Sequence, residues 1–205
     1  MYRQDLDLLI DPILAELSLP NLHLRAANDQ LAVFCDSLAE AKESNPYGAY
    51  VSHHAEEELV RDGGCAFLSY DNLCGVFIFK DGNIGAVFKS GRSTHRAAHL
   101  HLLLTALVVG GNKLDCFDGV LSLIYSGVGF IPVARVRFDR EYAPVNWNFE
   151  RDGEPDVVFW IHNGDTIDQI AKKYRTYPTT QIDVLPLYSK YEEAYAYRDS
   201  LITKP

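Results

Sequence analysis

Cysteine and long apolar runs are both scarce in this chain of 205 residues. The four cysteines are Cys35, Cys65, Cys74 and Cys116. Each stands alone inside an apolar run without C-x-x-C spacing, which favours buried free thiols over a disulfide framework or a zinc site. No apolar segment reaches the roughly 18 residues of a membrane span, because His99 and His101 interrupt the longest candidate. A membrane protein is therefore not expected.

Positive charge is also in short supply, with 19 Lys and Arg against 28 Asp and Glu and a net charge of -9. This balance argues against nucleic-acid binding, because phosphate contacts need clustered Lys and Arg. The stretch Met1–Asp5 lacks the charged and apolar regions of a signal peptide. We therefore expect a cytoplasmic protein, with 205 residues forming one domain of ordinary globular composition.

Apolar residues at spacings of three and four predict two N-terminal helices, over 6–17 and over about 22–43, and a short helix is possible at 54–60. Strand-like runs follow at 65–70, 75–80 and 84–89. The links Asp71–Cys74 and Asp81–Asn83 are typical of tight turns, so these three strands are expected to form an antiparallel meander.

The segment 93–109 is apolar on nearly every face and predicts a buried helix that Gly110-Gly111 ends. A strand at 113–117 is then expected to run parallel to 84–89. A helix at 119–126, strands at 133–138 and 156–162 and helices at 166–174 and 188–202 complete the chain. The aromatic loop at 139–155 either caps a cleft or is held by its own rings.

These elements predict an α+β fold with a mixed, mostly antiparallel central sheet flanked by helices. Within the single domain 1–205, N-terminal helices occupy 1–45, the core sheet and its helices 59–162, and a helical C-terminal extension 165–205. The strand, loop and buried helix over 84–109 also predict an anion site, because first-turn N–H groups of a helix have no internal partners.

Two motifs in this region carry a family resemblance. Arg92-Ser93-Thr94-His95-Arg96-Ala97 resembles the Gln/Arg-x-x-Gly-x-Gly/Ala pyrophosphate loop of the GNAT N-acetyltransferases, with His95 in place of the middle glycine. Tyr125-Ser126-Gly127-Val128-Gly129-Phe130 resembles their Tyr-x-x-x-Gly-Phe segment, and Asp118 stands where the family usually has Asn. The resemblance covers about residues 59–161 and extends to GNAT-like domains carried in phage polypeptides, many of which have no assigned activity.

The resemblance implies a GNAT-like fold that uses acetyl-CoA to acetylate an amine of a small molecule or a protein. It assigns the cofactor to the loop residues Arg92, Ser93, Thr94, His95, Arg96 and Ala97, together with Phe88 and Asp118. It assigns protonation of the departing thiolate to Tyr125. In this family the strands corresponding to 84–89 and 113–117 splay apart and admit the pantetheine arm.

Asp115 is our choice for the base or for an amine-binding carboxylate, because an acidic side chain inside a short apolar strand must face solvent or a cleft. The strand 84–88 has no carboxylate, so a base that works through water is an alternative. Each of three candidate residues also has a purely structural interpretation. Ser93 could cap a helix, Asp118 could cap the helix at 119–126, and Tyr125 could be a packing residue.

No metal site is expected, because the histidine pairings four residues apart, such as His54 with Glu58, lack an H-E-x-x-H pattern. Solvated or core histidines are the favoured interpretation. The alternative function is a catalytically inactive GNAT-like phage protein that acts as a binding or inhibitory module on a host factor. Fold alone does not decide between this and an acetyltransferase.

Overall fold

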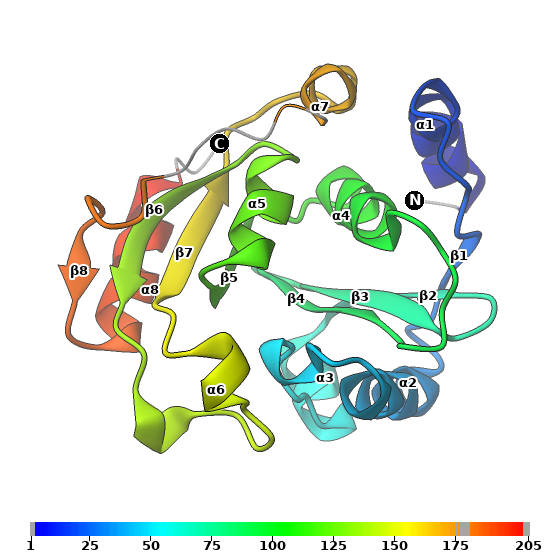
Figure 1. Ribbon diagram of the computed structural model, residues 1–205. Coiled ribbons are helices and arrows are strands. Elements are labelled where there is room, and N and C mark those ends of the chain that lie inside the picture. Colours follow the sequence, from blue (N-terminus) through cyan, green and yellow to red (C-terminus); the bar gives the residue numbers. More distant parts are fainter. Residues whose placement is uncertain (1–2, 175, 177–180, 203–205) are drawn as a thin grey trace. The chain divides into compact units, whose positions relative to one another are not determined.

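The computed structural model describes residues 3–174, 176 and 181–202, so parts of the predicted C-terminal extension, at 177–180 and 203–205, lie outside the described residues. The chain divides into two compact units, Met1–Asn112 and Lys113–Pro205. Helices and two four-stranded sheets confirm the α+β class (Figure 1). Among the described residues, no helix has both the length and the apolar character needed to cross a bilayer.

The sheet of the first unit has the order β1-β2-β3-β4, and all its pairs are antiparallel. Its strands are β1 (Leu24–Ala26), β2 (Gly64–Ser69), β3 (Cys74–Phe79) and β4 (Ile84–Lys89). The predicted meander is confirmed, and the carboxylates of Asp71 and Asp81 accept backbone N–H bonds within its turns. A register shift between β3 and β4 marks a bulge, where Ala86 has a φ of 48°.

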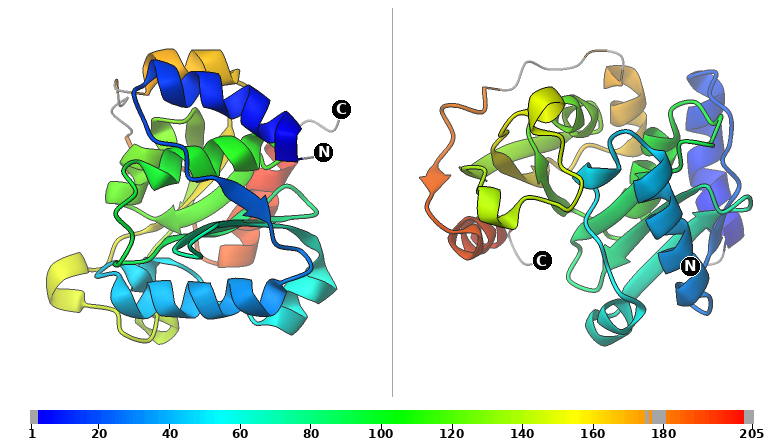
Figure 2. Two further views of the ribbon diagram at one scale, coloured as in Figure 1. Left: turned by 90° about the vertical axis from the view of Figure 1, so that its right-hand side faces the viewer. Right: turned by 60° about the horizontal axis from the view of Figure 1, so that its bottom comes forward.

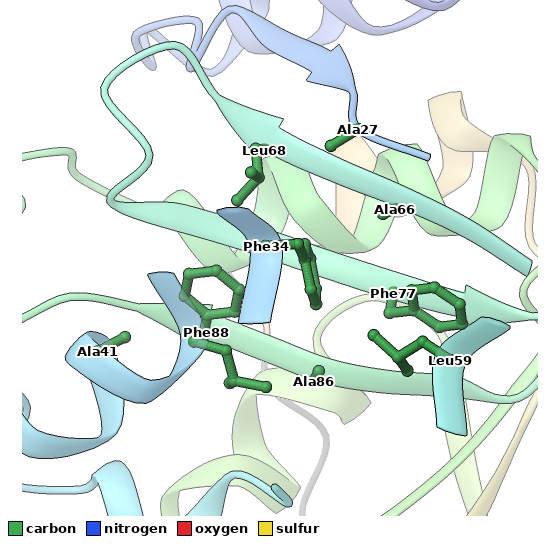
Figure 3. Close-up of a cluster of buried hydrophobic side chains, with 10 residues drawn as sticks. Ala27, Phe34, Ala41, Leu59, Ala66, Leu68, Phe77, Ala86 and Phe88 are labelled. Atoms are coloured by element: carbon green, nitrogen blue, oxygen red, sulfur yellow. The ribbon is translucent and has the colours of Figure 1, made fainter. Parts of the chain in front are cut away.

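Helices cover both faces of this sheet. Helices α2 (Leu31–Ser44) and α3 (Glu56–Asp62) lie on one face, and α4 (Ala98–Val108) lies on the other, with α1 (Arg3–Glu16) against α4 (Figures 1 and 2). A short 3-10 turn, η1 (Gly48–Tyr50), follows α2. The face of the sheet that α2 covers contains a buried cluster of apolar side chains. In this cluster the Phe34 ring lies 5.4 Å from that of Phe88 (Figure 3).

Two of the predicted helices begin at least five residues later than the sequence indicated. The helix expected over 22–43 is wrong in its first part, because Leu24–Ala26 forms β1 and pairs with Phe67–Ser69 of β2. The helix expected over 93–109 begins at Ala98, because Ala97 before it takes a left-handed conformation with a φ of 52°. In both places the helical spacing of apolar residues extends beyond the helix itself. The backbone there is extended or left-handed, and neither conformation belongs to a helix.

The sheet of the second unit has the order β5-β7-β6-β8. Its strands are β5 (Lys113–Phe117), β6 (Phe130–Val136), β7 (Val157–His162) and β8 (Leu187–Tyr188). The pairs of β7 with β5 and with β6 are antiparallel, and β8 pairs parallel to β6. The strand at 113–117 has the predicted bounds, but its hydrogen-bonded partner is β7. The strands thus form two sheets where one was expected.

Strand alternation sends neighbouring side chains of β5 to opposite faces of this sheet. The helix α5 (Val120–Ser126) contacts β5 and β6, and α8 (Tyr191–Leu201) contacts β6 and β7. Leu114 and Cys116 lie on the α5 face, where the Ser122 hydroxyl bonds the Cys116 thiol. Asp115 lies on the α8 face, opposite Phe159 in register. The short helix α7 (Ile167–Lys173) follows β7 and begins with a capping box at Thr166.

The loop at 139–155 is held by its own aromatic rings, which was one of the two predicted alternatives. It contains η2 (Arg140–Tyr142) and the short helix α6 (Phe149–Asp152). The ring of Trp147 lies 4.5 Å from that of Phe117 and 5.2 Å from that of Phe138. The Trp147 indole N–H also donates to the Gly153 carbonyl at 2.9 Å. The loop therefore has a fixed conformation of its own.

Candidate functional site

The loop between β4 and α4 presents backbone donors that the protein does not use. Gly91 N–H donates to Ser44 Oγ at 2.9 Å, and Arg92 N–H donates to Ser90 Oγ at 3.0 Å. Within the described part of the chain, the N–H groups of Thr94, Arg96 and Ala97 donate to no protein acceptor. These donors lie directly before the first turn of α4, whose dipole favours negative charge. The arrangement suits an anion such as a diphosphate.

Two arginines of this loop are exposed and add positive charge to it. The Arg92 guanidinium donates from Nε to Glu40 Oε1 of α2 at 2.8 Å, and this bond holds the pKa of the Glu40 carboxyl below its usual range. An ion pair exposed to this degree is weak, and a phosphate can compete for the guanidinium. Arg96 has no ion-pair partner among the described residues.

Ser93 and His95 have local partners in the first unit. Ser93 is buried with its Oγ 3.3 Å from Cys74 Sγ, and it accepts the His95 N–H at 3.3 Å. The interpretation of Ser93 as the cap of α4 is wrong, because Ala97 occupies the N-cap and makes no side-chain bond there. His95 Nε2 lies 3.1 Å from Asp71 Oδ2. The imidazole is thus turned toward the β2–β3 turn.

Phe88 belongs to the core of the first unit. It is 2% exposed, and its ring is so close to Gly75 that a Cβ there would lie 2.6 Å from it. Figure 3 shows Phe88 beside Phe34 and Ala41 on the α2 side of β4. Its side chain is committed to this cluster, so only its backbone is placed to meet a ligand.

Tyr125, in the second unit, is buried near the end of α5 with its ring 6.2 Å from that of Phe130. Burial raises the pKa of its hydroxyl far above the usual value, and the charges of Cys116 and Asp115 raise it further. The hydroxyl is therefore protonated at neutral pH, which is the state that a proton donor needs.

Asp115 is the counter-charge of a buried arginine in α8. Its Oδ1 lies 3.8 Å from Nη1 of Arg198, whose side chain is fully buried, and it also bonds the Tyr191 hydroxyl. Burial is the main cause of the raised pKa of Tyr191, and the Asp115 charge adds to it. Asp115 points toward α8, whereas Tyr125 belongs to α5 on the other face of the sheet. The two predicted catalytic residues therefore lie on opposite faces of this sheet.

The surroundings of Arg198 form a polar network that sequence reasoning missed. Arg198 Nε donates to Asp199 Oδ1 at 2.9 Å, and Lys113 Nζ donates to Asp199 Oδ2 at 2.8 Å. The guanidinium also lies 4.2 Å from the centroid of the Tyr195 ring. A signal was present: Tyr191, Tyr195 and Arg198 follow helical spacing, which places a cation on the same stripe as two aromatics.

Asp118 directly follows β5 and bonds residues at the beginning of α5. Its Oδ1 accepts the Gly119 N–H at 2.8 Å and the Ser122 hydroxyl at 2.6 Å. The prediction that Asp118 caps this helix is wrong, because Gly119 occupies the N-cap of α5 and no side chain of the described residues makes a capping bond there. The predicted cofactor loop thus lies in the first unit, and Asp115, Asp118 and Tyr125 lie in the second.

In the described ranges, no three His, Cys, Asp or Glu side chains lie close enough together to hold a metal ion. Comparisons with protein-family models, with curated proteins and with solved structures find no significant match. The candidate site of the first unit is therefore the loop before α4 together with the strand that precedes it.

Proposed function

We propose that the protein is an N-acetyltransferase that transfers the acetyl group of acetyl-CoA to an amine of a small molecule or a protein. The observation that carries the proposal is the set of unused N–H donors at Thr94, Arg96 and Ala97, which immediately precedes the buried helix α4. Exposed guanidinium groups on the same loop add charge-assisted bonds of the kind that a diphosphate accepts. The resemblance of this loop to the pyrophosphate loop of the GNAT family supplies the identity of the ligand.

The strand before the loop supports the same ligand. β4 is the last strand of its sheet, so one side of its backbone points away from β3. A pantetheine arm carries two amides and can add to such an edge by backbone hydrogen bonds.

The test is calorimetric titration of the protein with acetyl-CoA, using desulfo-CoA as a second ligand. Arg92→Ala with Arg96→Ala should weaken binding by roughly 1.5–3 kcal/mol for each charge-assisted bond removed. The matched control, Arg61→Ala with Lys80→Ala, removes the same charge from other exposed positions of the first unit and should change affinity little. Equal affinity in the loop variant and the wild type would remove this loop from the proposed site.

Tyr125→Phe tests the thiolate protonation that the resemblance assigns to Tyr125. The change should lower turnover by about 10²- to 10⁴-fold, the usual contribution of a positioned acid, and leave acetyl-CoA affinity unchanged. Release of the CoA thiol reports turnover, and the calorimetric titration reports affinity. Unchanged turnover in a folded variant would end the assignment.

A second candidate is the catalytically inactive binding module, and exposed apolar residues of the 139–155 loop favour it. Tyr142 is 80% exposed and Val145 is 88% exposed, although the loop has a fixed conformation. Exposed apolar side chains on an ordered loop are typical of contact surfaces for a partner. A wild-type protein that fails to bind millimolar acetyl-CoA would support this candidate and refute the first.

A further inference from the structure

His54 lies at the edge strand of the first unit, next to a position that has no side chain. Its ring stacks edge-on against Phe79 of β3 at 5.4 Å, and its side chain is 13% exposed. A Cβ at Gly85 of β4 would lie 2.7 Å from the Phe79 ring and 3.6 Å from His54 Nε2, so this nitrogen lies beside β4 at a glycine over which Phe79 packs. The imidazole is thus held in place by β3 while Nε2 points at β4.

A carboxylate sits on the other side of the same ring. Glu58 Oε1, on α3, lies 3.5 Å from His54 Nδ1, which is buried and has no hydrogen-bond partner among the described residues. A carboxylate beside Nδ1 favours the tautomer that carries its proton there. Nε2 then keeps its lone pair and can accept a proton.

The length of acetyl-CoA brings its thioester to this nitrogen. The inference rests on the proposed function, in which the loop that begins after Ser90 holds the diphosphate. From diphosphate to sulfur the pantetheine arm is roughly as long as four residues of extended chain. Four to five residues back along β4 from Ser90 are Ala86 and Gly85. The acetyl group of an arm that follows this edge therefore ends where Nε2 of His54 points.

We infer that His54 is the general base for the acceptor amine, with Glu58 orienting its ring. The proposal supplies the base that β4 lacks, since this strand carries no carboxylate. It also puts the acceptor amine at the edge of β4, beside the bulge at Ala86.

The step balances without a further reactant. The amine arrives as an ammonium and gives one proton to His54 Nε2. The freed lone pair forms the C–N bond at the thioester carbonyl carbon, and the C–S bond breaks with its electron pair leaving on sulfur. The nitrogen loses its second proton and the thiolate gains one, so the products are the amide and the CoA thiol. His54 returns its proton to solvent.

The first test is nuclear magnetic resonance of the imidazole nitrogens of the seven histidines. His54→Gln assigns the His54 signals by removing them, and the exposed neighbour His53 is the internal control. Acetyl-CoA should shift the signals of His54 and leave those of His53 in place. Adenosine 3′,5′-bisphosphate, which lacks the arm, should shift neither.

The second test is hydrolysis of acetyl-CoA without an amine, in which water takes the amine's place. His54→Gln should lower this rate at least tenfold at unchanged cofactor affinity, whereas His53→Gln should not. Acetyl-CoA binding without a shift of His54, an equal shift with the bisphosphate, or equal hydrolysis by the two variants would each overturn the inference while leaving the proposed function intact. Absence of acetyl-CoA binding in calorimetry would refute the proposed function itself.

Discussion

The buried histidine of α4 should make the stability of the first unit depend on pH. His101 is 2% exposed, and its Nδ1 accepts the backbone N–H of Leu22 at 3.0 Å, just before β1. Burial, with a smaller contribution from the charges of His23 and His95, lowers the pKa of His101 from 6.5 to about 4. The imidazole is therefore neutral in the folded protein at neutral pH. Protonation of His101 lowers the free energy of unfolding.

The sign and the size follow from proton linkage. Between the two pKa values the unfolded chain binds the proton and the folded protein does not, so the free energy of unfolding falls as the pH drops from 6.5 toward 4. At 1.36 kcal/mol per pKa unit the full loss is about 3 kcal/mol, and about 2 kcal/mol of it is lost by about pH 5. The contribution is complete above the unfolded pKa.

Two variants isolate this group from the other histidines. His101→Asn places an amide oxygen near Nδ1, keeps an acceptor for Leu22 and does not titrate. It should lose about 2 kcal/mol less than the wild type between about pH 7.5 and about pH 5. His101→Leu leaves the Leu22 N–H unpaired and should cost about 1–3 kcal/mol at neutral pH, also without the pH-dependent loss.

The assay is urea unfolding followed by far-ultraviolet circular dichroism, which reports the loss of helices, those of the first unit included. Tryptophan fluorescence is unsuitable there, because both tryptophans lie in the second unit. Equal losses of stability with pH in the wild type and His101→Asn would refute the reasoning, since they would show that His101 titrates alike in the folded and unfolded chain.

Three further predictions concern charges and backbone. Glu40→Gln frees Arg92 and should tighten acetyl-CoA binding about two- to fivefold by calorimetry, whereas Glu43→Gln on the same helix should not; equal effects would argue against a phosphate contact by Arg92. Ala97→Gly should raise the free energy of unfolding by up to about 1 kcal/mol, because alanine is strained at positive φ, and a lower value would contradict the left-handed conformation. Arg198→Ala should lower it by about 3–5 kcal/mol in fluorescence-monitored unfolding, and a loss under about 1 kcal/mol would show that the buried guanidinium does not hold α8.

Elements bounded by turn chemistry were predictable from the sequence. β4 has the predicted bounds because Asp81–Asn83 closes one end and Ser90-Gly91 the other. β1 was not predictable, because three residues of suitable periodicity become a strand only by pairing with β2, some forty residues later in the chain. The insertion of β7 between β5 and β6 is likewise a long-range choice that no local pattern records.

The candidate site divides in the same way. The loop at Arg92–Ala97 was found because a strand, a turn and a buried helix follow one another in sequence. The partner of Asp115 could not be found, because Arg198 lies 83 residues away and no local pattern pairs the two. His54 and Glu58 were recognised as neighbours on one helical turn, but the approach of Nε2 to Gly85 depends on how the segment before α3 meets β4.

The order of strands in the two sheets has a consequence for synthesis. The sheet of the first unit joins its strands in chain order, so all its strands are available for pairing once residue 89 has left the ribosome. In the second unit, β5 and β6 each pair with β7, which follows both of them in the chain. Contacts that join distant residues form slowly. We expect the first unit to fold on the ribosome while β5 waits for its partner, with its strand edge exposed to aggregation until β7 emerges.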